Sequence, residues 1–141
     1  LADNMEEKEE IAPFKVKAIL RAGLCQLSAG QYSSAKQKAL KALAIEPNSG
    51  DAFMMLGDAY LGGANTWGEN ACEKGAGYWA AVDKYQTAIS KDPSLREIAN
   101  NKISKAKSRY PEKSECFFIG KNEGDEIKVG SWINETTKVR F

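Results

Sequence analysis

Histidine is absent from the 141 residues of this chain. Without histidine the commonest general base is missing, and so is the usual partner of a nucleophilic serine or cysteine. The absence of histidine also excludes zinc sites of the mixed cysteine and histidine type. The three cysteines, Cys25, Cys72 and Cys116, form no CxxC pair, and three thiolates alone would need a carboxylate or water as a further zinc ligand. We therefore expect no bound metal, no cofactor and no enzymatic activity.

Long apolar runs and a bias toward one charge are also missing. Lysine, arginine or glutamate interrupts every apolar stretch, which argues against a membrane span. The formal net charge is only +1 and both signs are interspersed, so nucleic acid is not an expected partner. The chain opens on Leu1 and shows no charged-then-apolar leader, so we expect an excised or processed piece whose compartment its residues do not reveal.

An internal repeat is the main feature that the sequence does contain. Tyr32 to Pro47 and Tyr78 to Pro93 share a pattern of Tyr, then Ala three residues on, Ala seven further on and Pro five further on. These copies lie 46 residues apart, whereas the upstream residues Gly23 and Gly57 lie 34 apart. The difference, 46 − 34 = 12, predicts a unit of 34 residues that was duplicated and then opened by an insertion of twelve.

Apolar residues that recur at threes and fours predict helices over residues 14–28, 32–45, 51–61, 78–93 and 95–110. We expect Gly30 to end the first helix, and Asn48 with Ser49 to cap the third. The acidic segment 1–10 suits a solvated helix or the end of a preceding helix. Because Pro13 lies 34 residues before Pro47, the spacing favours the second interpretation, a truncated third copy that stops at Pro13.

Residues 62–77 contain five glycines among sixteen residues, which predicts a loop. Within it, Trp67 is either an exposed anchor for a partner or folded back onto Tyr60 and Tyr78. Cys72 is a candidate for a disulfide, with a residue of a partner as one option. Cys25, on an apolar helical stretch, is expected to be a small core residue.

After Pro111 the pattern changes to that of strands. We expect strands over residues 116–120 and 126–130 about a turn, with alternation again over 136–141. Thirty residues cannot form an independent core, so this tail should pack on the helices and seal the end of the array. Trp132 and the Phe117-Phe118 pair are expected to lie in its core.

Together these residues resemble the tetratricopeptide repeat, a helix-turn-helix unit of 34 residues. In the second copy the positions of the family signature hold Phe53, Leu56, Gly57, Tyr60, Tyr78, Ala81, Tyr85, Ala88 and Pro93. The first copy keeps Gly23, Tyr32, Ala35, Ala42 and Pro47 but departs from the signature at Ala22, Gln26 and Ala39. The resemblance implies an all-α, right-handed repeat array over residues 1–110, with repeats at about 16–49 and 50–95, a capping helix at 95–110 and a small β-rich tail at 111–141.

The resemblance also implies a function, the binding of a peptide or protein on the concave face formed by the first helix of each repeat. That face should carry Lys17, Leu20, Arg21, Leu24, Leu27, Asp51, Met54, Asp58 and Leu61, with Trp67 as an extra contact. Some family members hold a peptide's terminal carboxylate with a Lys, Asn and Arg clamp, but the matching places here hold Leu20, Leu24, Met54 and Asp58. We therefore expect an apolar groove with an acidic edge, suited to an amphipathic helix or to an apolar segment with nearby Lys or Arg.

Other interpretations remain open at this stage. The chain could be a structural or homodimerising segment that recruits nothing, its leucines covered by an adjacent helix or a second copy. A small hydrolase would need clustered carboxylates, for which Asp58, Glu69 and Glu73 are the candidates. The ending, residues 129–140, is similar to the tails of repeat proteins of Bacteroidetes bacteria that are often exported, which would place Cys72 in an oxidising periplasm or cell envelope.

Overall fold

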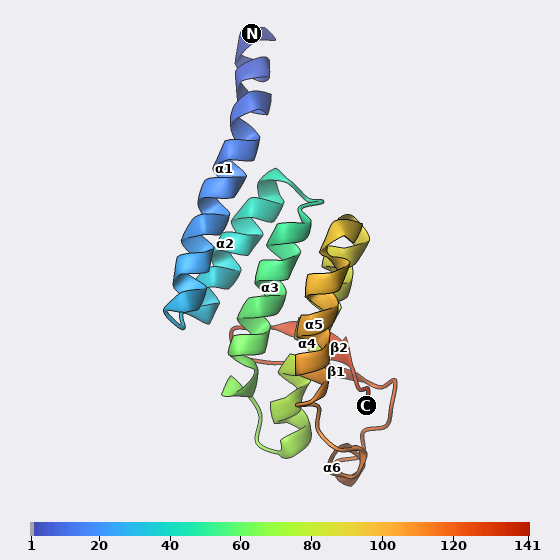
Figure 1. The fold of residues 1–141 in the computed structure, drawn as a ribbon. Helices are drawn as coiled ribbons and strands as arrows, with labels where there is room; N and C mark the ends of the chain where they lie inside the picture. The colour runs from blue at the N-terminus through green and yellow to red at the C-terminus, as the bar shows by residue number, and fades with distance from the viewer. Residues whose placement is uncertain (1) are drawn as a thin grey trace.

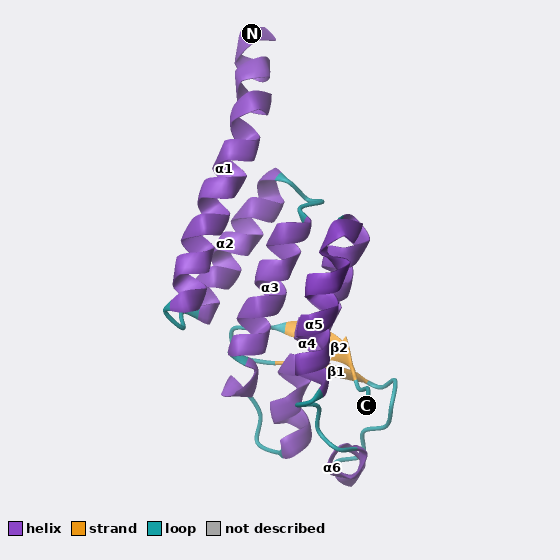
Figure 2. Cartoon of the chain, viewed as in Figure 1, coloured by secondary structure: helices purple, strands orange, loops and turns teal. Residues whose placement is uncertain are grey.

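The chain forms a mostly helical fold with one small antiparallel sheet (Figures 1 and 2). This computed structural model describes residues 2–141, with side chains from residue 11 onward. The helices are α1 (Ala2–Ser28), α2 (Tyr32–Ile45), α3 (Gly50–Gly62), α4 (Ala71–Lys91), α5 (Arg96–Lys107) and α6 (Lys113–Phe118), and the strands are β1 (Glu126–Val129) and β2 (Glu135–Lys138). The expected helical fold with a small strand-containing tail is confirmed.

Local signals end and cap the first helices as the sequence predicts. Gly30 adopts a φ of 74° just after α1, a left-handed conformation that suits glycine. The Ser49 hydroxyl accepts a hydrogen bond from the Ala52 N–H at the start of α3. Along α2 the alanines Ala35, Ala39 and Ala42 are completely buried. Their small side chains let the neighbouring helices approach closely.

The hydrophobic core lies mainly between α3 and α4. Its largest buried side chains include Tyr60 and Leu56 from α3, and Trp79 and Tyr85 from α4. Gly57 faces the Tyr85 ring so closely that a Cβ there would lie 2.5 Å from Cε1. Each large apolar side chain buried in this way stabilises the fold by about 1.5–3 kcal/mol before entropy is counted.

The predicted helix end at Pro13 is wrong. Helix α1 runs without interruption from Ala2 to Ser28 with Pro13 inside it, and its N-terminal half projects past α2 (Figure 1). Proline removes one backbone donor, which costs about 3 kcal/mol but does not by itself stop a helix. The glutamates, lysines and alanines around Pro13 are good helix formers, so the pattern of a truncated third copy does not appear as a separate helix.

The expected loop over residues 62–77 is wrong in its second half, because α4 begins at Ala71. The Asn70 side chain caps that helix by accepting a hydrogen bond of 2.9 Å from the Glu73 N–H. Gly75 lies against the ring of Pro111, and a Cβ on Gly77 would be 2.8 Å from the Ala64 Cα. These glycines therefore permit close packing rather than a flexible turn.

A disulfide between Cys72 and Cys116 joins the start of α4 to α6. Both cysteines are completely buried, and the bond lies within one chain, whereas the sequence left a bond to a partner open. The strand expected over residues 116–120 is wrong, since residues 116–118 belong to α6 and residues 119–120 form a turn. A capping box between Glu112 and Glu115 starts that helix, with the Glu112 N–H donating to Glu115 at 3.0 Å.

Three side chains expected in the core lie outside it. Phe118 is 90% exposed and Phe117 is also exposed, because only Cys116 of α6 and, in part, Ile119 just after it face inward. Cys25 is exposed as well. Gly23, two positions earlier, faces Met55 of α3 and Lys38 of α2. Because two residues correspond to a rotation of about 200° around a helix, the Cys25 thiol points away from α2 and α3.

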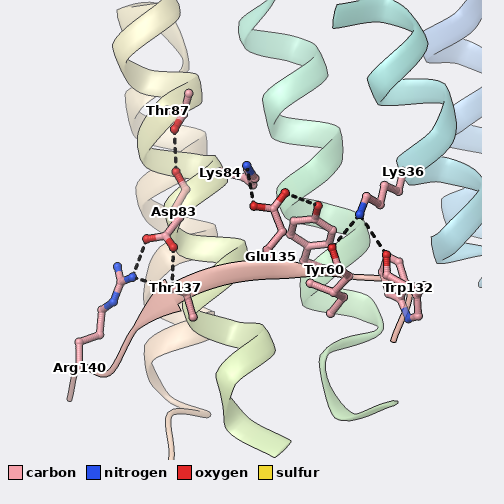
Figure 3. A network of polar contacts seen from close by, with 10 residues as sticks. Lys36, Tyr60, Asp83, Lys84, Thr87, Trp132, Glu135, Thr137 and Arg140 are labelled. Carbon is pink, nitrogen blue, oxygen red and sulfur yellow. Dashed lines mark hydrogen bonds and ion pairs between the residues drawn. The ribbon is translucent and has the colours of Figure 1, made fainter. Parts of the chain in front are cut away.

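The tail lies against three helices instead of sealing the end of the array. Strands β1 and β2 pair with Ile127 opposite Thr137 and Val129 opposite Glu135, and they bury one face. Figure 3 shows the polar contacts that hold the segment to α2, α3 and α4. Because bonding partners are distributed over all three helices, the segment runs across them.

Lys36 of α2 makes the most buried of these contacts. Its ammonium donates hydrogen bonds to the carbonyl oxygens of Trp132 at 3.0 Å and Ile133 at 2.7 Å, and lies 5.5 Å from the centre of the Tyr60 ring (Figure 3). Burial lowers the Lys36 pKa. The Tyr60 hydroxyl donates to Glu135 at 3.0 Å, and burial together with that carboxylate raises the Tyr60 pKa.

Candidate functional site

A cavity of about 270 Å³ lies between α1 and α3. Its walls are Lys17, Leu20, Arg21 and Leu24 from α1, and Asp51, Met54, Met55 and Asp58 from α3. On each helix these residues recur at threes and fours, so they share one face. We call this cavity the α1–α3 groove. The structure brings together here seven of the ten residues that the sequence nominated for partner binding.

The floor of the α1–α3 groove is apolar and part of its wall is open to solvent. Met54 and Met55 are only 8% and 3% exposed, whereas Leu24 is 54% exposed. Sequence reasoning missed Met55, which packs against Gly23 of α1. The phase of α3 places Met55 beside Met54, but only the approach of α1 at Gly23 makes it part of the groove.

Asp58 gives the groove much less acidity than the sequence suggested. Its carboxylate accepts hydrogen bonds from Lys102 at 2.7 and 2.8 Å and from the Tyr85 hydroxyl at 2.7 Å. Burial and the adjacent Asp58 carboxylate raise the Tyr85 pKa, so the phenol keeps its proton and donates. The expected acidic edge is therefore reduced to Asp51, because Lys102 of α5 neutralises Asp58.

Two further nominated leucines lie elsewhere. Leu61 lines a second cavity, of about 260 Å³, with Gly62, Tyr78, Lys105 and Arg109. We call it the α3–α5 cavity, since Leu61 comes from α3 and Lys105 from α5. Leu27 packs against the hydrophobic core instead of lining either cavity. The two cavities lie on successive turns of α3.

Trp67 is half-buried, which contradicts the expectation of an exposed anchor. It lies under Gly130 of the tail, where a Cβ would be 2.8 Å from Trp67 Cδ1. The ring beside Tyr60 is that of Trp132, with centroids 5.8 Å apart. Trp67 thus helps to hold the tail, and the sequence offered no signal for this pairing across more than sixty residues.

Two other candidates have polar side chains that are already partly engaged within the protein. A hollow of about 510 Å³ lies beside the β1–β2 pair, but its Asp83 already accepts hydrogen bonds from Thr137 and Arg140 (Figure 3). The carboxylates considered for hydrolysis serve other purposes, since Glu73 accepts from the Glu69 N–H at the start of α4. Within residues 11–141 no three potential ligand side chains are grouped as a metal ion would require.

None of the helices in the described part of the chain combines the length and apolar character that crossing a bilayer requires. Comparison with protein-family models, with curated proteins and with solved structures finds no significant match to the chain.

Proposed function

We propose that this chain is a protein-interaction module of the tetratricopeptide-repeat type, and that it binds an apolar segment of a peptide or protein in the α1–α3 groove. The observation that carries the proposal is the open apolar wall, where the half-exposed Leu24 stands beside the buried methionines Met54 and Met55. An apolar cavity of this kind suits the anchor side chain of a partner segment.

The repeat architecture is supported by how the helices pack. Helix α1 is followed by α2 and α3 by α4, and the equivalent glycines Gly23 and Gly57 each sit where another helix approaches closely. The groove is lined by α1 and α3, the first helix of each pair. The tail bonds to Lys36 of α2, Tyr60 of α3 and Asp83 of α4, and none of these three residues lines the groove.

Binding is tested with peptides selected against the immobilised chain from a random display library. The selected peptide is then measured by fluorescence anisotropy against Leu24→Ala and against the matched control Leu40→Ala, an exposed leucine of α2 outside the groove. Completing the burial of Leu24 should contribute about 1 kcal/mol, so we expect Leu24→Ala to weaken binding about fivefold. Met54→Ala should weaken binding as well.

The control should leave affinity unchanged. Amide chemical shifts should move on α1 and α3 when the peptide is added. Equal affinities for the two leucine variants, or shifts confined to the tail, would contradict the assignment of the groove.

Self-association through α1 is a second candidate function. Phe14 is 72% exposed, and Ile11 and Cys25 are also exposed on the part of α1 that faces away from α2 and α3. Such an apolar strip suits a second copy or another helix. Light scattering on a Cys25→Ala background should then give a dimer that Phe14→Ser converts to a monomer. A monomer at every concentration would exclude this role.

A further inference from the structure

Positive side chains dominate the face that carries both cavities. Lys17 and Arg21 border the α1–α3 groove, and Lys105 and Arg109 border the α3–α5 cavity. All four are exposed, and within residues 11–141 none of them takes part in an ion pair. A fifth cation, Lys102, lies three residues before Lys105 on α5 and bonds to Asp58 of the groove.

The negative charge on this face is largely used up within the protein. Asp58 is held by Lys102 through two hydrogen bonds and by the Tyr85 hydroxyl, so it offers little to a ligand. Asp51 is then the one carboxylate without an ion pair among the described residues that line the two cavities. Four available cations against one available carboxylate make the face attractive to anions.

We propose that the segment bound by this module is both acidic and apolar. This inference rests on the proposed function and states the chemistry of the partner. One apolar side chain enters the α1–α3 groove against Leu24 and Met54. Aspartate or glutamate side chains of the same segment reach Lys17 with Arg21 at one cavity, and Lys105 with Arg109 at the other.

The two pairs of cations border different cavities, which are offset along α3. Met54 of the groove and Leu61 of the α3–α5 cavity are seven residues apart on α3, which is about 10 Å along a helix. An extended segment covers that distance in about three residues. Because a chain terminus supplies its carboxylate at one place only, at least one position is met by an acidic side chain.

Four synthetic peptides test the proposal, all acetylated and amidated so that they carry no terminal charge. All four have the same length. Three have a central leucine, flanked by glutamates in the first, by lysines in the second and by serines in the third. The fourth has a central serine flanked by glutamates. Anisotropy should rank the glutamate–leucine peptide tightest, and its affinity should fall as salt rises to about 0.3 M. A peptide with a free C-terminus should bind no tighter than the amidated one.

Charge reversal locates the contacts. Arg21→Glu and Lys105→Glu should each weaken the glutamate–leucine peptide by about fivefold, since each replaces an attraction at an exposed position by a repulsion. Lys41→Glu, an exposed lysine of α2 with no ion pair in residues 11–141, is the matched control and should have no effect.

The outcomes separate the two proposals. If the lysine–leucine or serine–leucine peptide binds as well as the acidic one and depends on Leu24, the acidic preference is overturned while the groove stands. Insensitivity of binding to both charge reversals overturns it as well. If none of the peptides binds and display selection also yields no ligand that depends on Leu24, the proposed function itself fails.

Discussion

Reduction of the Cys72–Cys116 disulfide should lower the stability of the chain by about 4 kcal/mol. The two cysteines are 44 residues apart, and a cross-link of that span removes about 13 cal/mol/K of entropy from the unfolded chain, which is about 4 kcal/mol near room temperature. Reduction leaves both sulfurs in place, so the packing at these buried positions changes little. The loss should therefore come mainly from the freed unfolded chain.

Urea unfolding with and without dithiothreitol measures this difference. The experiment uses Cys25→Ala, because the exposed thiol of Cys25 would otherwise exchange with the disulfide. Reduction should shift the midpoint strongly and raise the denaturant slope slightly, since the reduced unfolded chain exposes more surface. The six-residue helix α6 cannot persist alone, so its amides should exchange faster after reduction while those of α2 and α3 change less.

A matched control is the variant in which Cys72 and Cys116 are both alanine in the same background. Its stability should not respond to dithiothreitol. The reasoning is refuted if reduction of the intact disulfide changes the free energy of unfolding by less than about 1 kcal/mol, because loop closure would then contribute little here.

Two further predictions concern buried polar side chains. Replacing Lys36 by methionine keeps its aliphatic stem but deprives two carbonyl oxygens of their donor, so we expect a loss of about 2 kcal/mol in urea unfolding. Amide exchange around Ile133 should become faster. A gain in stability would instead mean that the desolvation of the Lys36 ammonium costs more free energy than its hydrogen bonds contribute. The second prediction is a loss of stability above pH 10, because the pKa values of Tyr60 and Tyr85 are raised in the folded state from 10.0. The unfolded chain then releases protons that the folded chain keeps, so stability is present below pH 10 and declines by about 1.4 kcal/mol per pH unit for each tyrosine. The lowered pKa of Lys36 acts in the opposite direction, because below pH 10.5, the ordinary pKa of lysine, it makes the stability rise with pH. The test measures the free energy of unfolding from pH 9 to 12 on the Cys25→Ala background. Tyr85→Phe should reduce the decline of that free energy by about 1.4 kcal/mol per pH unit, the contribution of one tyrosine. An unchanged slope would contradict a raised pKa for Tyr85.

Helices α2 and α3 could be predicted because their signals are local. Apolar spacing, a glycine stop and a serine cap all lie within a few residues of the boundary that they set. Helix α2 accordingly begins at Tyr32 and ends at Ile45, as predicted, and α3 differs from its predicted span by one residue at each end. The spacing of one helix face is equally local, which is why most of the groove residues could be named.

The features that could not be predicted depend on residues distant in sequence. A sequence does not distinguish a glycine that forms a turn from one that allows another segment to pack closely. Gly75 is of the second kind, and the residue that packs on it, Pro111, is 36 positions away. The disulfide partner of Cys72 is likewise 44 residues away. The charge of the groove was misjudged for the same reason, since Asp58 is neutralised by Lys102 from another helix.

Residues 62–77 contain the insertion that the sequence predicts between two copies of a repeat, and their contacts indicate a structural role. Cys72, Gly75 and Gly77 are all buried, and they hold α6, Pro111 and the turn at Ala64. Trp67, next to them, lies under the tail. None of these residues lines the α1–α3 groove or the α3–α5 cavity. This segment thus fastens the C-terminal tail to the helices, whereas under the proposed function selectivity for a partner should depend on the exposed cations and on Leu24.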